Sequence, residues 1–354
     1  MVKHGAKLIS LLSLSTAQLA SCCSDWIMDD SFGLSVRTMD LGEGPNFSLK
    51  TQPKGHQAKL EGIEPAKYGH IISVGANMSA FKPANASKVD PNHEMAFAGL
   101  NEAGLSCDLH ALLNSAYPPY DPKAKHPVNL YFFCNLVLGQ YGTVAEVKEA
   151  LSAGDVQLWG PAALERGGVH FIVRDSAGHG LAVEFLESAV KLYDDKNDGV
   201  DSFGVFTNEP PFAWQLENVR HYKWKQSLAR PSTAMPGAWY PDERFLRIYL
   251  TKSGMPPPTS YQEAVQHALH VLNTITVPMG KQMGTDSGFG EGNADHTHYG
   301  HVYDHKQRIL YWRHQSNLQL ERVRLDDVLR SPTPVSLAMK NDLPFFQDAA
   351  HKFA

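Results

Sequence analysis

The sequence has no excess of basic residues. Its 32 Lys and Arg residues are outnumbered by 37 Asp and Glu residues, which gives a formal net charge of -5 at pH 7. The basic residues are also scattered along the chain, whereas a surface that binds nucleic acid needs them clustered. We therefore expect no nucleic-acid partner.

Beyond its first 22 residues, the sequence lacks an apolar run long enough to span a bilayer, so we expect no membrane span. The apolar run at residues 8–20 is too short to cross a membrane, follows two lysines and ends in small residues. This order is typical of a secretory signal peptide. We interpret residues 1–22 as a signal peptide or propeptide, and we expect a secreted or lysosomal protein.

A second interpretation of this leader is a bacterial lipoprotein signal, in which Cys22 is acylated and retained. Three acceptor sequences for N-glycosylation favour a eukaryotic secretory route instead. They begin at Asn46, Asn77 and Asn85. A secreted glycoprotein is therefore the expected product.

The sequence contains no internal repeat, low-complexity tract or linker, so we treat residues 23–354 as one domain. Hairpin signals alternate with helical segments, which favours an α+β fold with antiparallel sheets over repeated βαβ units. The segment that opens with Thr143 has Glu146 three residues later, a capping-box arrangement. Strands are predicted within residues 26–28, 33–36, 68–74, 95–105, 169–174, 180–185, 298–304 and 308–312, helices within 128–139, 143–151, 212–227 and 261–275, and a loop within 116–127.

Two of the four cysteines, Cys22 and Cys23, stand together at the end of the leader. A cut between them would make Cys23 the first residue, with a thiol nucleophile and its own α-amine as base. The α-amine titrates near pH ~7.7–8, so it can take the thiol proton directly or through water. The predicted hairpin folds Arg37 and Asp40 back towards Cys23, where an arginine would hold the thiolate and an aspartate would orient the amine.

Four motifs follow one another along the chain: Cys23-Ser24 with Arg37-Thr38-Met39-Asp40, then Asn101-Glu102-Ala103-Gly104-Leu105, then Thr207-Asn208-Glu209-Pro210, and last Glu243-Arg244-Phe245-Leu246-Arg247. In this order they resemble the choloylglycine hydrolase and penicillin V acylase family. The resemblance implies the fold of the N-terminal-nucleophile hydrolases, a four-layer αββα sandwich with two antiparallel sheets.

The resemblance also implies roles for five residues. Cys23 would be the nucleophile, Arg37 would lie beside its sulfur and Asp40 would bind the α-amine. Asn208 would donate a hydrogen bond to the oxyanion, an interaction worth roughly 10²–10³ in rate, and Arg244 would complete the charged cluster. The implied reaction is acyl transfer from a linear amide to Cys23, then hydrolysis of the thioester, with no cofactor.

The implied partner is a small-molecule N-acyl amide. Bile-acid conjugates, penicillin V-like phenoxyacetamides and fatty N-acyl amides all suit an apolar pocket with a polar leaving amine. The choice among them stays open, and so does the oligomeric state, including a homo-oligomer.

The sequence departs from the family pattern in two places. The separation from the nucleophile to Arg37 is shorter by two residues when counted from Cys23, and by one when counted from Cys22. Because side chains of a strand alternate between its faces, a deletion of two keeps Arg37 on its face and a deletion of one inverts it, which favours Cys23. The second departure is Ala111, preceded by His110, where the family often has an Asn or Tyr near the oxyanion hole; any role there falls to the backbone or to His110.

Each residue also has a plainer interpretation. The adjacent cysteines suit one end of a disulfide, Arg37 and Asp40 a surface ion pair, Asn208 a turn, and Arg244 the polar face of a helix. Cys107 and Cys134 are either a disulfide or two buried thiols. A catalytically silent secreted binding protein with the same fold is the alternative function.

A metal site is the weaker interpretation of a histidine cluster near the C-terminus. His296, His298, His301 and His305 lie in a segment expected to be an exposed strand and turn, without further ligands at recognisable spacing. The glycine-rich segment 284–292 lacks the Lys-Ser/Thr ending of a phosphate-binding loop and is interpreted as a loop or lid.

Overall fold

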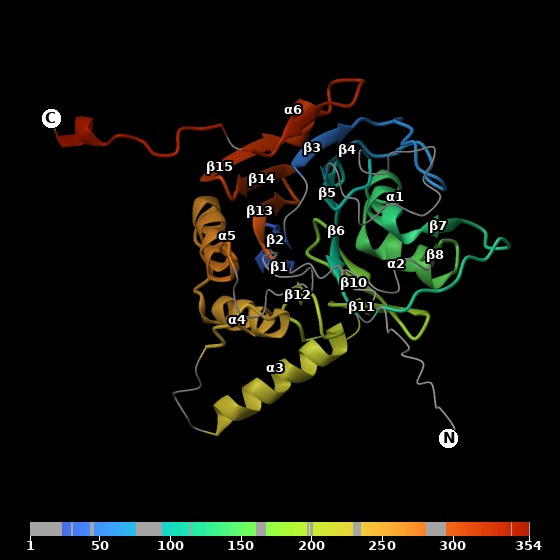
Figure 1. Ribbon diagram of the computed structural model, residues 1–354, viewed down its shortest axis with the longest axis horizontal. Coiled ribbons are helices and arrows are strands. Elements are labelled where there is room, and N and C mark those ends of the chain that lie inside the picture. Colours follow the sequence, from blue (N-terminus) through green and yellow to red (C-terminus); the bar gives the residue numbers. More distant parts are fainter. Residues whose placement is uncertain are drawn as a thin grey trace, which may run out of the picture.

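The extended segments of the chain form two large antiparallel sheets in the computed structural model (Figure 1). The structure describes residues 23–29, 31–42, 46–75, 94–113, 115–160, 168–196, 198, 201–228, 235–280, 295–340 and 342–353. The leader at 1–22, the acceptor sites at Asn77 and Asn85, and the glycine-rich segment 284–292 lie outside these residues.

The first sheet contains the N-terminal hairpin. Its six strands, in spatial order, are β12 (Val205–Thr207), β1 (Ser24–Asp29), β2 (Leu34–Leu41), β13 (His296–Asp304), β14 (Ile309–His314) and β15 (Asn317–Arg324). The turn before β2 contains Gly33, whose φ of 71° suits a residue without a Cβ. The predicted hairpin is therefore confirmed.

The second sheet is larger and is built mostly from consecutive hairpins. Its eight strands, in spatial order, are β11 (Ala189–Asp194), β10 (Gly180–Leu186), β9 (Val169–Arg174), β6 (Ser106–Ala111), β5 (Ala98–Asn101), β4 (His70–Gly75), β3 (Phe47–Gln52) and β16 (Ser336–Ala338). Two further strands, β7 (Pro127–Asn129) and β8 (Gln157–Trp159), pair in parallel.

The Asn-Glu-Ala-Gly-Leu motif forms the turn between β5 and β6. Asn101 Oδ1 accepts hydrogen bonds from the backbone nitrogens of Ala103 and Leu105, at 3.0 and 2.9 Å. Gly104 has a φ of 82°, and a Cβ there would fall on the carbonyl oxygen of His305. The motif is thus a turn that packs one sheet closely against the other.

Helices cover the outer faces of both sheets (Figure 1). On the first sheet, α4 (Pro241–Gly254) packs on β12 and β1, and α5 (Tyr261–Ile275) packs on β2 and β13. On the second, α1 (Phe133–Gln140) packs on β5 and β6, and α2 (Val144–Ser152) packs on β10. These layers confirm the predicted α+β, αββα architecture. The remaining helices are α3 (Phe212–Ser227), α6 (Leu325–Val328) and the 3₁₀ turns Leu130–Phe132 and Ala350–Phe353.

Local signals in the sequence placed most helices correctly. The capping box is present, with Thr143 Oγ1 accepting from Glu146 N at 3.2 Å and Glu146 accepting from Thr143 N. The helices predicted at 212–227 and 261–275 are α3 and α5. Among the described residues, no helix is both long and apolar enough to cross a membrane.

The helix predicted over 128–139 begins later than expected. Val128 is in strand β7, and the side chain of Asn129 accepts a hydrogen bond from Tyr131 N, which caps a short 3₁₀ turn before α1. An asparagine that caps the following turn sets where a helix can begin. The spacing of apolar residues does not show where such a cap places the start of the helix.

The expectation of an exposed strand around His298 and His301 was wrong. Strand β13 is buried along its whole length, because β2 and β14 flank it and α5 covers it. Strands β11 and β15 were not predicted. Both are partly exposed edge strands that lack a run of buried apolar residues.

Candidate active site

The register of the β1–β2 hairpin decides which side chains share a face with Arg37. Asp25 pairs with Arg37 across the hairpin, and directly paired residues of antiparallel strands point to the same face. Cys23 is two residues before Asp25, so its side chain points to that face as well. The parity argument from the sequence therefore agrees with the register.

Arg37 lies between the two sheets and is fully buried. Its Nη1 donates to Tyr299 Oη at 2.9 Å, and its Nη2 donates to the carbonyl oxygen of Leu109 on β6 at 2.9 Å. Its Nε lies 3.2 Å from Asp108 Oδ1, an ion pair from which water is excluded. The interpretation of Arg37 as part of a surface ion pair is wrong.

The charge of Arg37 is favourable for a thiolate. Burial opposes that charge, but Tyr299 and a Cys23 thiolate raise the pKa of Arg37 above its ordinary value. Burial also raises the pKa of Asp108 above its ordinary value, although Arg37 opposes this shift. Arg37 thus stays charged beside Cys23.

Cys23 is 1% exposed, so its side chain is buried in the site. Its Sγ lies 4.0 Å from Met39 Sδ and 3.9 Å from the carbonyl oxygen of Asp40. Its backbone nitrogen donates to Asn208 Oδ1 at 2.5 Å. In the uncut chain that nitrogen belongs to the 22–23 peptide bond, and a cut there would turn it into the α-amine.

Asn208 follows strand β12. A hydrogen-bond donor meets the oxygen end of its side-chain amide, and an acceptor meets the nitrogen end. Oδ1 accepts from Arg244 Nη2 at 3.0 Å, and Nδ2 donates to the carbonyl oxygen of Ala111 at 2.9 Å. Arginine can only donate and a carbonyl can only accept, so the two ends of the amide are not interchangeable. Position 111 therefore contributes a backbone carbonyl oxygen to Asn208, and no side chain.

Arg244 joins the site from helix α4 and is fully buried, so it does not lie on the polar face of that helix. Its Nη1 donates to the carbonyl oxygen of Cys23 at 2.9 Å and to Ser24 Oγ. The same nitrogen lies 3.7 Å from Asp40 Oδ2. Arg244 therefore contacts Cys23, Ser24 and Asp40 at once.

Asp40 is also fully buried, at the end of β2. Its Oδ2 accepts from Thr38 Oγ1 at 3.0 Å, and its Oδ1 accepts from Thr297 Oγ1 at 2.6 Å. Burial raises the pKa of Asp40 to about 6, against the opposing effects of Arg244 and the two threonines. The described hydrogen bond from the Cys23 nitrogen goes to Asn208, and the role of Asp40 towards the amine stays a prediction.

The structure thus brings together Cys23, Arg37, Asp40, Asn208 and Arg244, and it adds residues that the sequence did not single out. Asp108 and Tyr299 hold Arg37 in place. Gln215 of helix α3 donates to Thr207 Oγ1 at 3.1 Å and to the carbonyl oxygen of Glu209 at 3.0 Å, on either side of Asn208. The sequence did carry one signal for Asp108, because a polar residue at an inward-facing position of an otherwise apolar strand indicates a buried polar site.

His110 does not contact Asn208 in the described hydrogen bonds. Its ring packs against Phe206 and His170, with centroid distances of 5.3 and 6.1 Å. Burial, together with the charge of Arg37, lowers the pKa of His110 well below its ordinary value. His110 is therefore a neutral, buried side chain behind the site.

The histidines of β13 and the turn after it do not converge on one point. His305 contacts Ser35 Oγ at 2.7 Å and the carbonyl oxygen of Gly104 at 2.8 Å, while His298 Nε2 lies 3.0 Å from the carbonyl oxygen of Gly42. His301 stacks on Tyr299. In the described part of the chain, no group of three or more His, Cys, Asp or Glu residues is placed to hold a metal ion.

Comparison of the sequence with known proteins points to one family, and comparison of the structure shows a shared fold. The model of the linear amide C-N hydrolases, choloylglycine hydrolase family, matches residues 23–335. The chain is 25% identical to a bile salt hydrolase/transferase of Clostridium perfringens over 64% of this chain and 72% of that protein. It is 26% identical to a penicillin V acylase of Pectobacterium atrosepticum over 70% of this chain and 64% of that protein.

Solved structures show the same fold. Penicillin V acylase from Agrobacterium tumefaciens superposes with a TM-score of 0.71 at 20% identity, covering 90% of this chain and 91% of that one. A variant of conjugated bile acid hydrolase from Clostridium perfringens gives a TM-score of 0.70 at 20% identity, covering 90% and 97%.

Proposed function

The chain belongs to the choloylglycine hydrolase family of linear amide C-N hydrolases, and from this premise we propose that it cleaves an N-acylated small molecule through the thiol of Cys23. The proposal requires a cut between Cys22 and Cys23, by removal of a secretory leader or by later trimming. We propose a secreted or lysosomal location for the same reason. One observation carries the proposal: Cys23 points to the face of Arg37 while its nitrogen lies 2.5 Å from Asn208 Oδ1.

The first half of the reaction would acylate the enzyme. The α-amine takes the proton of the thiol, and the thiolate, which the charge of Arg37 favours, attacks the amide carbonyl carbon. Asn208 Nδ2 carries a second N–H besides the one given to Ala111, and that N–H would donate to the oxyanion. The C–N bond then breaks, the leaving amine takes the proton from the α-ammonium group, and the acyl group remains on Cys23 as a thioester.

The second half would restore the thiol. Water attacks the thioester carbonyl and gives a proton to the α-amine, Asn208 again holds the oxyanion, and the C–S bond breaks. The thiolate takes the proton back and the carboxylic acid leaves. Arg244 would act by position, since its contacts with the Cys23 carbonyl oxygen and with Asn208 Oδ1 fix the distance between nucleophile and oxyanion donor.

The experiment combines N-terminal mapping with an activity panel. Mass spectrometry of the mature protein should find Cys23 as its first residue, and assays with a bile-acid conjugate, penicillin V and a fatty N-acyl amide should find turnover of at least one. Cys23→Ser should abolish turnover, whereas Cys22→Ser keeps a small residue before the cut and should preserve it. An acyl adduct on Cys23, trapped by acid quench, would identify the thioester.

The proposal fails if the mature chain begins at Cys22 or upstream of it. It also fails if Cys23→Ser keeps full activity, which would place the chemistry elsewhere in the same fold. A mature N-terminus at Cys23 without turnover of any of the three amide classes would contradict the proposed substrates.

A further inference from the structure

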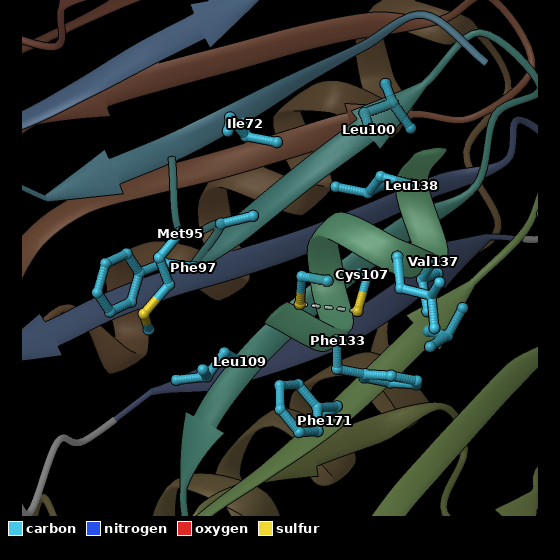
Figure 2. Close-up of a cluster of buried hydrophobic side chains, with 14 of the residues drawn as sticks. Ile72, Met95, Phe97, Leu100, Cys107, Leu109, Phe133, Val137, Leu138 and Phe171 are labelled. Atoms are coloured by element: carbon cyan, nitrogen blue, oxygen red, sulfur yellow. Dashed lines mark hydrogen bonds between the residues drawn. The ribbon is translucent and has the colours of Figure 1, made fainter. Parts of the chain in front are cut away.

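Two cysteines outside the candidate active site lie against each other in the core of the second sheet. Cys107 is on β6 and Cys134 is in α1, and their sulfur atoms are 2.8 Å apart. That separation is less than an ångström longer than the ~2.05 Å of a disulfide bond. Figure 2 shows this contact beneath α1, with Phe133, Val137 and Phe171 around it.

We propose that Cys107 and Cys134 are joined by an intramolecular disulfide, which closes while the chain folds and leaves Cys23 as the reduced thiol. The pairing follows from the faces of the strands. Cys107 points away from the space between the sheets, because its neighbour Asp108 points into that space towards Arg37. The sulfur of Cys23 contacts Met39 and the backbone of Asp40 instead.

The surroundings of the pair favour a bond over two thiols. Both cysteines are 0% exposed, and the side chains around them belong to the main apolar cluster. An S–H group is a weak donor and sulfur a weak acceptor, so two thiols gain little from facing each other in an apolar core. A disulfide places the same two sulfur atoms together without a polar hydrogen.

Burial also decides when the bond can form. Only a thiolate attacks a disulfide, and burial raises the pKa of Cys107 and of Cys134 above their ordinary value. No oxidant of the size of a glutathione disulfide can reach sulfur atoms that are fully covered. The exchange therefore belongs to the folding chain, before α1 closes over β6.

The oxidant is a dialkyl disulfide, RSSR, such as oxidised glutathione or the disulfide of an oxidoreductase. One cysteine thiolate attacks RSSR and forms a mixed disulfide, releasing RS⁻. The second thiolate attacks the cysteine sulfur of that mixed disulfide and releases another RS⁻. The two thiol protons end on the released groups, so two Cys–SH and one RSSR give Cys107–S–S–Cys134 and two RSH.

The position of the bond links it to the candidate active site. Strand β6 offers the carbonyl oxygen of Leu109 to Arg37 and the carbonyl oxygen of Ala111 to Asn208. A covalent tie from Cys107 to α1 would hold this strand against its helix while those two acceptors are in use. A tie across a loop of this length is expected to raise Tm by several degrees.

The test is peptide mapping after controlled refolding of the full chain. Reduced, unfolded protein is refolded either with oxidised glutathione or with dithiothreitol, then alkylated under denaturing conditions without reduction and digested. With oxidised glutathione we expect the Cys107 and Cys134 peptides to be linked, Cys23 to be alkylated, and Tm to exceed that of the dithiothreitol sample. Cys134→Ala should show the same Tm under both conditions.

Three outcomes would overturn the proposal. The first is alkylation of both Cys107 and Cys134 after refolding with oxidised glutathione, and the second is a link from either one to Cys23. The third concerns timing: protein that was folded in the reduced state and then exposed to oxidised glutathione should keep both thiols, and rapid closure of the bond would contradict formation during folding. Peptide mapping reads all three directly, even if a cysteine variant folds poorly.

Discussion

Arg244 Nη2 donates to Asn208 Oδ1 at 3.0 Å, and this bond decides which way the Asn208 amide points. The guanidinium has no acceptor, so it selects the oxygen end of the amide and leaves the nitrogen end to donate to the carbonyl oxygen of Ala111. A residue of α4 thus sets the orientation of a residue that follows β12. The consequences for catalysis and stability are testable one side chain at a time.

Asn208→Ala is expected to lower kcat by about 10²–10³ with a smaller change in KM, because in the proposed mechanism the lost N–H donates to the oxyanion and not to the bound ground state. Steady-state kinetics on the best substrate of the panel measures both constants. Asn135→Ala is the matched control: that buried asparagine holds Ala96 N and the carbonyl oxygen of Glu94, so its loss should lower Tm and keep kcat. Equal kinetic effects of the two variants would contradict the role of Asn208.

Arg37→Met is expected to slow alkylation of Cys23 by iodoacetamide and to move the pH profile of that reaction to higher pH. The charge that favours the thiolate is lost, and a tenfold slower reaction at pH 7 corresponds to about 1.4 kcal/mol. Tyr299→Phe removes one hydrogen bond to Arg37 and keeps the charge, so its effect should be smaller. An unchanged alkylation rate in Arg37→Met would show that the charge of Arg37 does not influence the thiol of Cys23.

Asp40 should make stability depend on pH in a defined direction. Its folded pKa is about 6, above the ordinary 3.8, so the unfolded chain loses this proton first as pH rises. The contribution of Asp40 is therefore fully present below pH ~4 and is lost as pH rises through ~6, by about 3 kcal/mol in all. Denaturant unfolding at pH 4 to 7 should show wild type losing that amount relative to Asp40→Asn. A gain with pH instead would mean that the ion pair with Arg244 outweighs burial.

Gln215→Ala should reduce kcat about tenfold and leave KM nearly unchanged. The variant leaves Thr207 Oγ1 and the carbonyl oxygen of Glu209 without their shared donor, so the segment that carries Asn208 loses its anchor. Trp214→Ala changes the adjacent residue of α3, which is 69% exposed, and should alter neither constant. If Gln215→Ala lowers Tm and leaves kcat unchanged, Gln215 contributes to stability but does not position Asn208 for catalysis.

Local patterns in the sequence were reliable where one element decides the outcome. Helix α2 begins where Thr143 and Glu146 form a capping box, and the β1–β2 hairpin turns where glycine takes a positive φ. They failed where partners from other elements decide. Strand β13 has four histidines within or next to it and looked exposed, yet α5, β2 and β14 bury it.

The candidate site shows the same division. Its five predicted residues came from short motifs, and their convergence agrees with those motifs. Asp108 and Gln215 carried too little local signal, because a buried acid and a helical glutamine gain their roles only from the residues that they meet. The position of Ala111 shows the limit most plainly, since its contribution is a backbone carbonyl that no side-chain pattern can encode.

The sequence by itself predicted that Cys23 and Arg37 share one face, because a deletion of two residues keeps the side-chain alternation of a strand, and the register of β1 and β2 agrees with this prediction. Only the tertiary structure brought Asn208 and Arg244 to Cys23, across separations of 185 and 221 residues along the chain. Such contacts depend on how two sheets and a helix pack. The same packing excludes water from Arg37, Asp40 and Arg244, and the low dielectric that results strengthens their electrostatic interactions.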